Sequence, residues 1–306
     1  MMRKIKKYIS NPKLILFWII VAFPKLIKSD RKFLELKYYV NFEKWPDLDN
    51  PKTYSEKIQW LKLYNRRPEY VQMVDKAEAK KYVSSILGDK YIIPTIAIYN
   101  RAEDINFDEL PNQFVLKCTH DSGGIVICKD KNKLDKKVAI EKLEKGLERN
   151  FFWETREWPY KNVKPRIIVE EYIDPGPQTN DLPDYKFFCF NGEPKYCQVI
   201  SGRGTKMCID FFDKNWNHQP FHEPRNFSFA EVEPKRPNHF EEMMKLAAVL
   251  SKGMPFSRID FYDVNDKVYF GEITFYPTSG IGGFDPVEWD EIFGSYINLS
   301  FSSCTV

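Results

Sequence analysis

The segment RIDFYDVNDKVYFGEIT, residues 258–274, carries the strongest structural signal in this chain of 306 residues. β-Branched and aromatic residues lie on both sides of the turn-forming run 263–266, a pattern that predicts an antiparallel hairpin. Such a hairpin can bring Asp260 and Glu272 together, and two carboxylates supply the hard oxygen ligands that Mg²⁺ prefers. Arg258 lies on the same face as Asp260 and could neutralise charge that develops on a phosphoryl group. Taken alone, the segment fits an edge hairpin with a solvated ion pair equally well.

The composition is that of a folded protein with one basic region. Apolar residues make up 43% of the chain and aromatic residues 16%, which is enough to bury a large core. Residues 1–37 contain ten Lys or Arg and two acidic residues, a charge of +8, whereas the remaining 36 basic and 41 acidic residues give −5. Because the positive charge is confined to one end, we expect no nucleic-acid partner. The six cysteines form no C-x-x-C pair, which favours a reducing, cytoplasmic compartment.

The N-terminal segment predicts contact with a membrane surface. Residues 14–23 are ten consecutive apolar residues with lysines on both sides. A bilayer span needs about twenty such residues, and no small-residue cleavage site follows, as a secretory signal would require. We therefore expect residues 1–30 to place a basic, Trp-containing helix at the inner face of the cell membrane. The alternative is an apolar helix that docks on the protein's own core.

Helices and hairpins alternate along the rest of the chain. Thr53, followed by Glu56, predicts the N-cap and capping box of a helix, and a second helix over about 70–87 should end at Gly88. The Asn-Gly pair at 191–192 predicts the turn of another hairpin. The other expected elements are strands at 113–117, 125–128 and 167–173, helices at 131–149 and 239–252, and a surface excursion at 213–238. This mixture indicates an α+β fold.

A lysine and a glycine-containing loop follow the first of these predicted strands. Lys117 ends the strand, and the loop contains His120, Ser122, Gly123 and Gly124. Backbone N–H groups of such a loop, with the ammonium at its base, can bind polyphosphate oxygens. The sequence contains no Walker motif, dinucleotide-binding glycine motif or protein-kinase motif, so those nucleotide folds lack support.

Two further segments have residues suited to a nucleotide. Lys76 stands at the start of a predicted helix, where it could make a second phosphate contact. Glu170, Glu171, Tyr172 and Ile173 end an apolar strand. At the edge of a cleft, a carboxylate and main-chain groups of this segment could read the amino group of adenine.

The order of these segments resembles that of ATP-grasp enzymes, and most closely their TupA-like branch, which is named for teichuronopeptide biosynthesis. The resemblance rests on NPKT and EKIQWLK within residues 50–62, VDK at 74–76, LPNQFVLKCTH at 110–120, DYKFFCFNGEP at 184–194, and RIDFY and GEITF within 258–275. Each phrase is unspecific alone. Together, in this order, they extend the resemblance over about residues 50–285.

The resemblance implies roles for the residues that would hold ATP. Lys76 and Lys117 match the two lysines that hold ATP phosphates in the superfamily. The loop from His120 to Gly124 matches the mobile lid over the triphosphate, and residues 170–173 match the hinge that reads adenine. Three aspartates compete for the role of the ribose-binding acid: Asp174, Asp181 and Asp184.

The resemblance also implies the residues of a magnesium site. Asp260 and Glu272 match the Mg²⁺-binding acids, and Arg258 matches the arginine that contacts the transferring phosphoryl group. Thr274 stands where many members have Asn as a further ligand, and its hydroxyl can still ligate or orient a metal. Lys186 is typical of the TupA-like branch, and we include it among the nucleotide-binding candidates with its role open.

The fold implied is the ATP-grasp fold, in which antiparallel-sheet lid and core subdomains clamp ATP, here with an N-terminal helical extension. The expected units are a basic and apolar extension at 1–48, a helical and α/β subdomain at 49–112, a lid at 113–168, and a core with the Mg²⁺ site at 169–306.

The activity implied is ATP-dependent ligation of a carboxylate to an amine. Phosphoryl transfer would turn the carboxylate into an acyl phosphate that an amine can attack, and closure of residues 118–128 would exclude water. In the TupA-like branch we expect a uronic acid of a surface polysaccharide, such as capsule, and an amino acid. Small residues at 276–283 should line the reaction site. The aromatic residues at 151–160 could stack a sugar ring, although core packing is their more ordinary use.

Two other functions stay open on the sequence. Asp47 and Asp49 form a D-x-D pair, with which a glycosyltransferase of polysaccharide synthesis could hold a metal and a nucleotide sugar. Thr274 and the unassigned ribose acid leave room for a catalytically silent nucleotide-binding or scaffolding protein. His218 and His222 have the spacing of a zinc pair, but with no third ligand nearby a surface loop is the simpler interpretation.

Overall fold

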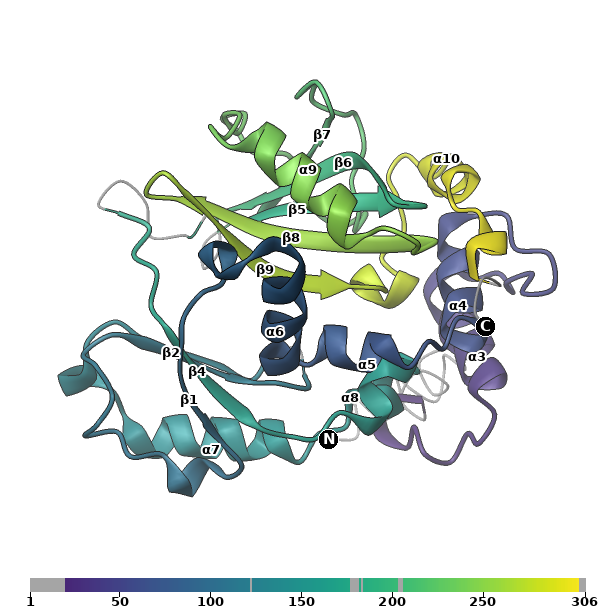
Figure 1. Cartoon of the computed structure of the whole chain (residues 1–306). Coiled ribbons are helices and arrows are strands. Elements are labelled where there is room, and N and C mark those ends of the chain that lie inside the picture. The colour runs from purple at the N-terminus through teal and green to yellow at the C-terminus, as the bar shows by residue number, and fades with distance from the viewer. Residues whose placement is uncertain (1–19, 122, 177–181, 183, 203–205, 303–306) are drawn as a thin grey trace.

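Two antiparallel sheets form the centre of the computed structural model, which describes residues 20–121, 123–176, 182, 184–202 and 206–302 (Figure 1). The core sheet has the order β7-β6-β5-β8-β9 and consists of β5 (Asp184–Phe190), β6 (Glu193–Ser201), β7 (Cys208–Asp213), β8 (Phe256–Val264) and β9 (Lys267–Thr274). The lid sheet has the order β1-β4-β2-β3 and consists of β1 (Thr95–Tyr99), β2 (Phe114–Cys118), β3 (Ile125–Cys128) and β4 (Ile167–Glu171). With the helices around them, these sheets confirm the predicted α+β class.

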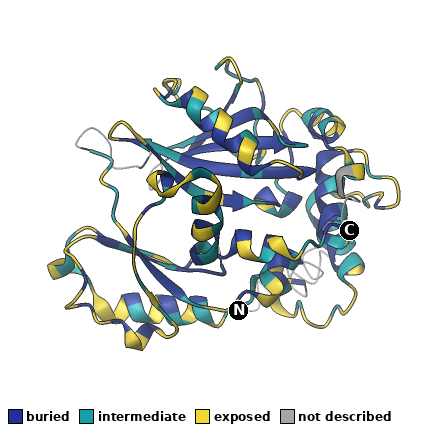
Figure 2. Ribbon diagram, viewed as in Figure 1, coloured by how far each residue is buried: buried dark blue, intermediate teal, exposed yellow. Residues whose placement is uncertain are grey.

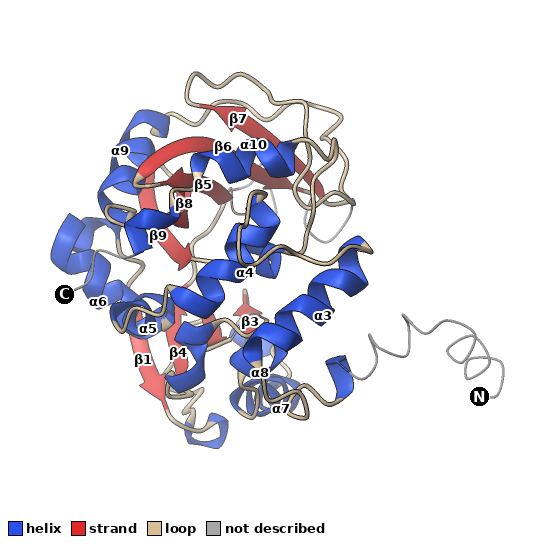
Figure 3. Ribbon diagram, turned by 90° about the vertical axis from the view of Figure 1, so that its right-hand side faces the viewer, coloured by secondary structure: helices blue, strands red, loops and turns tan. Residues whose placement is uncertain are grey.

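The helices surround both sheets, and α5 and α6 lie between them in both views (Figures 1 and 3). The α-helices are α3 (Asp30–Phe42), α4 (Tyr54–Tyr64), α5 (Glu69–Val74), α6 (Lys76–Leu87), α7 (Lys136–Leu147), α8 (Phe151–Thr155), α9 (Phe240–Leu250) and α10 (Trp289–Tyr296). Short 3₁₀ helices are η1 (Asp89–Tyr91), η2 (Ala102–Asp104), η3 (Lys131–Lys133), η4 (Trp158–Asn162), η5 (Pro277–Gly280) and η6 (Leu299–Ser302).

The core sheet buries an apolar layer on each side but leaves part of one face polar. On one face, the rings of Phe187 and Phe240 of α9 lie 5.7 Å apart. On the other face, Phe293 of α10 packs against Phe188 and Phe190 at one end of the sheet. Figure 2 shows these strands mostly as buried. Because side chains alternate between faces, the polar part of the second face is where the candidate site lies.

The lid sheet has a separate small core. Helix α7 covers one face, where Phe114, Leu116 and Leu143 are fully buried. The opposite face is more open, since Ile98 and Ile127 are 42% and 58% exposed. In the register of β2 and β3, these exposed positions share their face with Lys117. The sheet therefore turns an apolar, lysine-bearing surface away from α7.

Local sequence signals were reliable for helix ends and turns. The capping box of α4 is present, because the Thr53 hydroxyl accepts from the N–H of Glu56 and the Glu56 carboxylate accepts from the N–H of Thr53. Helix α6 ends at Gly88, which has a positive φ of 89°. The predicted Asn-Gly hairpin turn is confirmed at 191–192, where both residues also have positive φ.

Some element boundaries differ from the expected ones. The helix expected over about 70–87 is two helices, α5 and α6, because Asp75 between them is extended and caps α6. The predicted helix at 131–149 begins as η3, and α7 starts only at Lys136 because Asp135 accepts from the N–H of Val138 and caps it. The lid sheet includes β1 and extends to Glu171, so it takes in chain on both sides of the expected 113–168 unit. Residues 214–239 contain only isolated bridges in their described part, as expected of a surface excursion.

Most of the apolar segment 14–23 lies outside the described residues. Ile20 is buried in a small cluster with Phe33 and Leu34, while Val21 and Phe23 are 59% and 47% exposed. In the described part of the chain, none of the helices combines the length and the apolar character needed to cross a bilayer.

Candidate active site

The predicted hairpin is formed by β8 and β9, and it brings the acidic pair together. Asp260 lies opposite Glu272 in the strand register, and Arg258 lies opposite Thr274. All four side chains point to the polar face of the core sheet, away from α9. Asp260 is 1% exposed, whereas the Glu272 side chain is 47% exposed. Of the two carboxylates, Glu272 is therefore the one that a ligand can reach from solvent.

A single guanidinium holds both carboxylates. Arg258 donates from Nε to Oδ1 of Asp260 at 2.7 Å and from Nη2 to Oδ2 at 2.8 Å. The same Nη2 donates to Oε1 of Glu272 at 2.9 Å and to Oγ1 of Thr274 at 3.1 Å. Burial alone would raise the pKa of Glu272, but Arg258 and Lys186 outweigh it and lower that pKa to about 2. Glu272 is therefore an anion at neutral pH.

Lys186 adds a second cation to this group. It lies opposite Asp260 on β5 and is 7% exposed, and its Nζ contacts Asp260 and, at 2.8 Å, Asp184. Burial would lower the pKa of Lys186, but the two carboxylates outweigh it and raise that pKa. Three carboxylates thus meet two cations, which gives a formal charge of −1 when all five are ionised, although burial raises the pKa of Asp260.

These residues fit a Mg²⁺ ion that arrives with a nucleotide. Glu272 offers a partly exposed carboxylate, and Thr274 orients it by donating to Oε1 at 3.2 Å. Mg²⁺ commonly takes one or two protein carboxylates and completes its shell with phosphate and water oxygens. Within the described ranges, no three His, Cys, Asp or Glu side chains form a metal-ligating group. Phosphate and water oxygens would therefore have to supply the other ligands.

On the lid sheet, Lys117 is held by a buried carboxylate. Its Nζ lies 2.5 Å from Oε2 of Glu170, and Oε1 of the same residue lies 2.5 Å from Nζ of Lys80 on α6. Glu170 is 3% exposed, and the two lysines outweigh burial and lower its pKa. The Glu170 side chain is therefore engaged with lysines. Sequence reasoning missed Lys80, although it lies one helical turn after Lys76.

Lys76 joins the start of α6 to the loop after β2. Its Nζ donates to the carbonyl of Asp121, and its N–H donates to the carbonyl of Thr119 at 3.0 Å. The preceding residue, Asp75, caps α6 and also accepts from Arg166 at 2.8 Å. Both lysines predicted to hold phosphates therefore already have acceptors in the lid sheet or its loop: Lys117 contacts Glu170, and Lys76 contacts the carbonyl of Asp121.

The loop between β2 and β3 is packed closely at its base. A Cβ on Gly124 would lie 2.8 Å from Sγ of Cys118, so only glycine fits there without movement. His120 is 3% exposed, and its Nε2 lies 3.0 Å from the carbonyl of Arg149, which turns its ring into the lid. Gly123 has a positive φ of 133°, and Ser122 lies outside the described residues.

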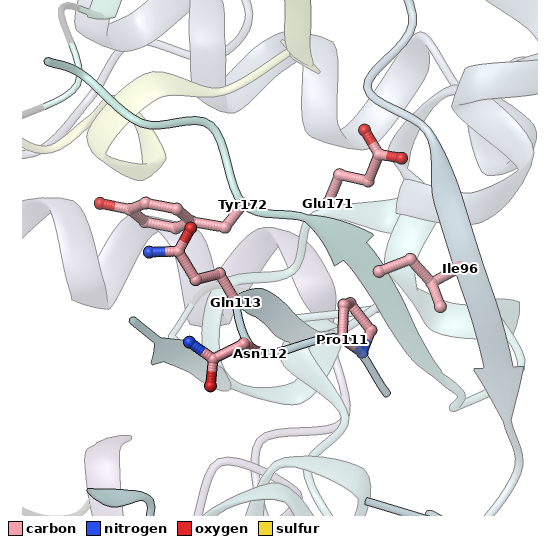
Figure 4. Close-up of a pocket in the computed structure, with 6 residues that line it drawn as sticks. All are labelled: Ile96, Pro111, Asn112, Gln113, Glu171 and Tyr172. Carbon is pink, nitrogen blue, oxygen red and sulfur yellow. The ribbon is translucent and has the colours of Figure 1, made fainter. Parts of the chain in front are cut away.

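Two of the residues predicted to read adenine border an open pocket at one end of the lid sheet. Glu171, Tyr172 and Ile96 of β1 line it together with Asn112 and Gln113, and the Tyr172 ring lies beside Gln113 (Figure 4). The pocket measures about 440 Å³. The exposed side chain of Glu171, unlike that of Glu170, is available at this end of the strand.

Comparison with known proteins agrees with this arrangement. A family model described as TupA-like ATPgrasp matches residues 56–298, most of the chain. The chain belongs to the TupA-like ATP-grasp family. A search of curated protein sequences finds no match.

Among solved structures, this TupA-like ATP-grasp protein is similar to D-alanine–D-alanine ligases. The Bacillus anthracis enzyme is 18% identical over 66% of this chain and 57% of its own, with a TM-score of 0.40. The Helicobacter pylori enzyme is 15% identical over 80% of this chain and 69% of its own, with a TM-score of 0.41. An N5-carboxyaminoimidazole ribonucleotide synthetase from Thermus thermophilus is 10% identical over 72% of this chain and 47% of its own, with a TM-score of 0.39. The chain thus spans just over half the length of the Bacillus anthracis ligase.

Other candidate residues of the TupA-like protein have structural partners. Asp49 is bound by two nitrogens of Arg31, each at 2.8 Å, so the D-x-D pair does not present two open carboxylates. His218 bonds Asp210 at 2.8 Å, and the ring of His222 lies 3.8 Å from that of Phe229. Neither histidine is part of a metal-ligating group within the described chain.

The two remaining open assignments are the ribose acid and the aromatic segment. Asp174 accepts from the N–H of Gly176 at 2.9 Å, Asp184 is paired with Lys186, and Asp181 lies outside the described residues. In the segment 151–160, Phe152 is 1% exposed, which agrees with core packing.

Proposed function

We propose that this protein is an ATP- and Mg²⁺-dependent ligase that joins a carboxylate to an amine. The observation that carries the proposal is the single guanidinium of Arg258 bonded to both Asp260 and Glu272 on neighbouring strands. Charges of both signs, fixed on neighbouring strands of one sheet, suit the stabilisation of a transferring phosphoryl group. Membership of the ATP-grasp family supports the same reaction class.

The proposed reaction has two steps. A carboxylate oxygen of the substrate takes the γ-phosphoryl group of ATP, which releases ADP and leaves an acyl phosphate. The amine then attacks the acyl carbon, so that an amide forms while phosphate and a proton leave. Mg²⁺, when bound by Asp260 and Glu272, supplies charge neutralisation at the phosphates.

The protein's own residues have separate tasks in this scheme. Arg258 contacts the phosphoryl group, and Lys76 and Lys117 bind the phosphates after leaving their internal acceptors. Glu170 holds Lys117 until the phosphates bind. The main chain of 171–173 reads adenine, and the glycine loop covers the triphosphate and excludes water.

The proposed carboxylate is a uronic acid of a surface polysaccharide such as capsule, or of its precursor, and the proposed amine is an amino acid. The support for this choice is the TupA-like branch itself. A cytoplasmic protein bound to the inner face of the membrane through residues 1–30 fits the same role. The exposed Val21, Phe23 and Leu26, next to Lys25 and Lys28, support a lipid-facing surface.

The reaction is tested by incubating the full chain with ATP, Mg²⁺, pooled uronic-acid nucleotides and pooled amino acids. Mass spectrometry should find ADP, phosphate and a product lighter than its two parents by one water. In a parallel sample hydroxylamine replaces the amino acids, and an acyl phosphate should be trapped as a hydroxamate. Release of UDP with ATP untouched would contradict the ligase and support a glycosyltransferase. No turnover with nucleotide still bound would support the scaffolding alternative.

Membrane contact is tested by sedimenting the full chain with vesicles. We expect binding to phosphatidylcholine vesicles that contain phosphatidylglycerol, and its loss at high salt, because the attraction is electrostatic. Equal recovery in the supernatant with and without the anionic lipid would contradict the proposal.

A further inference from the structure

The loop that follows the acidic hairpin has an unusual backbone. Within η5, directly after β9, Thr278 has φ 49° and ψ 22°, and Ser279 has φ 57° and ψ 22°. Two consecutive residues that are not glycine therefore lie in the left-handed region. Each such residue has a strained backbone and persists only where the surroundings impose it. Contacts from the surrounding chain must therefore hold Thr278 and Ser279 in this conformation.

From one side, helix α4 holds the loop with a buried lysine. Lys62 is fully buried, and its Nζ donates to the carbonyl of Ser279 at 2.8 Å and to its hydroxyl at 2.7 Å. Gln59, one turn earlier, donates to the carbonyls of Ser279 and Gly280 at 3.1 and 3.0 Å. A Cβ on Gly280 would collide with the side chain of Ile58, so the loop also packs tightly on α4.

The charge of Lys62 has a buried counterpart. The carboxyl of Glu157, which is 4% exposed, lies near enough to Lys62 for its charge to raise the pKa of that lysine. Burial lowers the pKa of Lys62 to about 7, against the opposing effect of Glu157. Burying an ionisable pair of this kind is costly, and the loop accepts two hydrogen bonds from its lysine.

From the other side, a residue of the surface excursion holds the loop. Glu223 is 1% exposed, and its Oε1 lies 2.7 Å from Oγ1 of Thr278. That hydroxyl also lies 2.7 Å from the carbonyl of Pro277. The Thr278 hydroxyl has one proton for these two acceptors. If it donates that proton to the carbonyl of Pro277, a protonated Glu223 can donate to the hydroxyl, and all three groups are then hydrogen-bonded. Burial raises the pKa of Glu223 to about 7, in agreement.

We propose that Lys62 and Glu223 are positioning residues that fix the loop at 277–280 beside the acidic pair, so that it can orient the acceptor substrate. They come from segments far from the hairpin in sequence, and each bonds a different residue of the strained pair. The statement about substrate rests on the proposed ligase function. The statement about the loop stands on the contacts alone.

The loop itself is tested by hydrogen exchange with mass spectrometry on the full chain. In Lys62→Met and Glu223→Ala, amides of 275–284 should exchange at least tenfold faster, while those of 113–128 stay unchanged. Glu223→Gln should behave like the original protein, because its amide can donate to Thr278 as the protonated carboxyl does. Lys137→Met, an exposed lysine of α7, is the matched control.

Kinetics test the substrate part with whichever carboxylate and amine the turnover assay identifies. In Lys62→Met, KM for one of them should rise at least tenfold, while KM for ATP stays within twofold. If either variant fails to fold, Ser279→Ala and Thr278→Val take its place, because they remove from within the loop the hydroxyls that Lys62 and Glu223 contact. Unchanged exchange in 275–284, or equally faster exchange along the whole chain, would overturn the positioning role. An inactive original protein would refute the ligase and leave the exchange test valid.

Discussion

Glu272 is the member of the acidic pair that is open to solvent, and its neutral isostere gives a direct test of the site. We expect Glu272→Gln to lower kcat at least a hundredfold, because an amide removes a charge that Mg²⁺ needs and leaves Arg258 in excess. ADP release at saturating ATP measures this. Glu288→Gln, on an exposed residue, should keep full activity. Retention of more than a tenth of the activity in Glu272→Gln would remove this residue from the proposed machinery.

Glu223 makes stability depend on pH in the direction opposite to an ordinary carboxylate. Its pKa is raised by burial from 4.5 to about 7, so between these values the native state holds a proton that the unfolded state has lost. The free energy of unfolding should therefore fall as pH rises through this window, by on the order of 3 kcal/mol from this group. Urea unfolding at pH 5 and pH 8 should show a smaller decrease in Glu223→Gln. An identical decrease in both proteins would contradict the assignment.

At the scale of elements, the turn between β2 and β3 depends on the absence of one side chain. Gly124→Ala places a methyl group against Cys118, and we expect a loss of about 1–3 kcal/mol in the free energy of unfolding. Cys118→Ala opens this space, so the double variant should recover part of the loss. Chemical denaturation of the four proteins in a double-mutant cycle measures the coupling. Strictly additive effects would show that the two residues do not compete for space.

The elements that could be predicted are those whose signal is local. The β8–β9 hairpin, the capping box at Thr53 and the turn at 191–192 follow from neighbouring residues, and all three are present. The pairing of β1 with β4 could not be predicted, because it joins strands about seventy residues apart. The same holds for the contacts of Lys80 and Glu223, which depend on how distant segments meet in three dimensions.

At the scale of the whole molecule, Arg156 ties the N-terminal segment to the rest of the chain. It is fully buried, donates to the carbonyls of Pro24 and Ile27 at 2.8 and 2.9 Å, and lies 4.1 Å from the ring of Phe33. Arg156→Met should reduce the free energy of unfolding by about 3 kcal/mol or more, since it leaves these part-buried carbonyls and the Asp30 carboxylate without their donor. Limited proteolysis should then cut near residues 24–32.

Arg156→Lys keeps the charge of that side chain but loses its forked geometry. The stability of this variant should therefore lie between that of the original protein and that of Arg156→Met. Thermal unfolding followed by circular dichroism ranks the three proteins. If both variants were as stable as the original, Arg156 would not hold the N-terminal segment.

The bonds between α6 and the lid sheet have a mechanical consequence. Lys76, Asp75 and Lys80 of this helix and its cap contact the β2–β3 loop, Arg166 and Glu170, so α6 is fastened to the lid at three points. The apolar face of the same helix, with Ala79 and Val83, packs in the hydrophobic cluster of the core sheet. Helix α6 therefore joins the two sheets, through polar contacts on the lid side and apolar packing on the core side. Any movement of one sheet against the other would have to break one of these two sets of contacts.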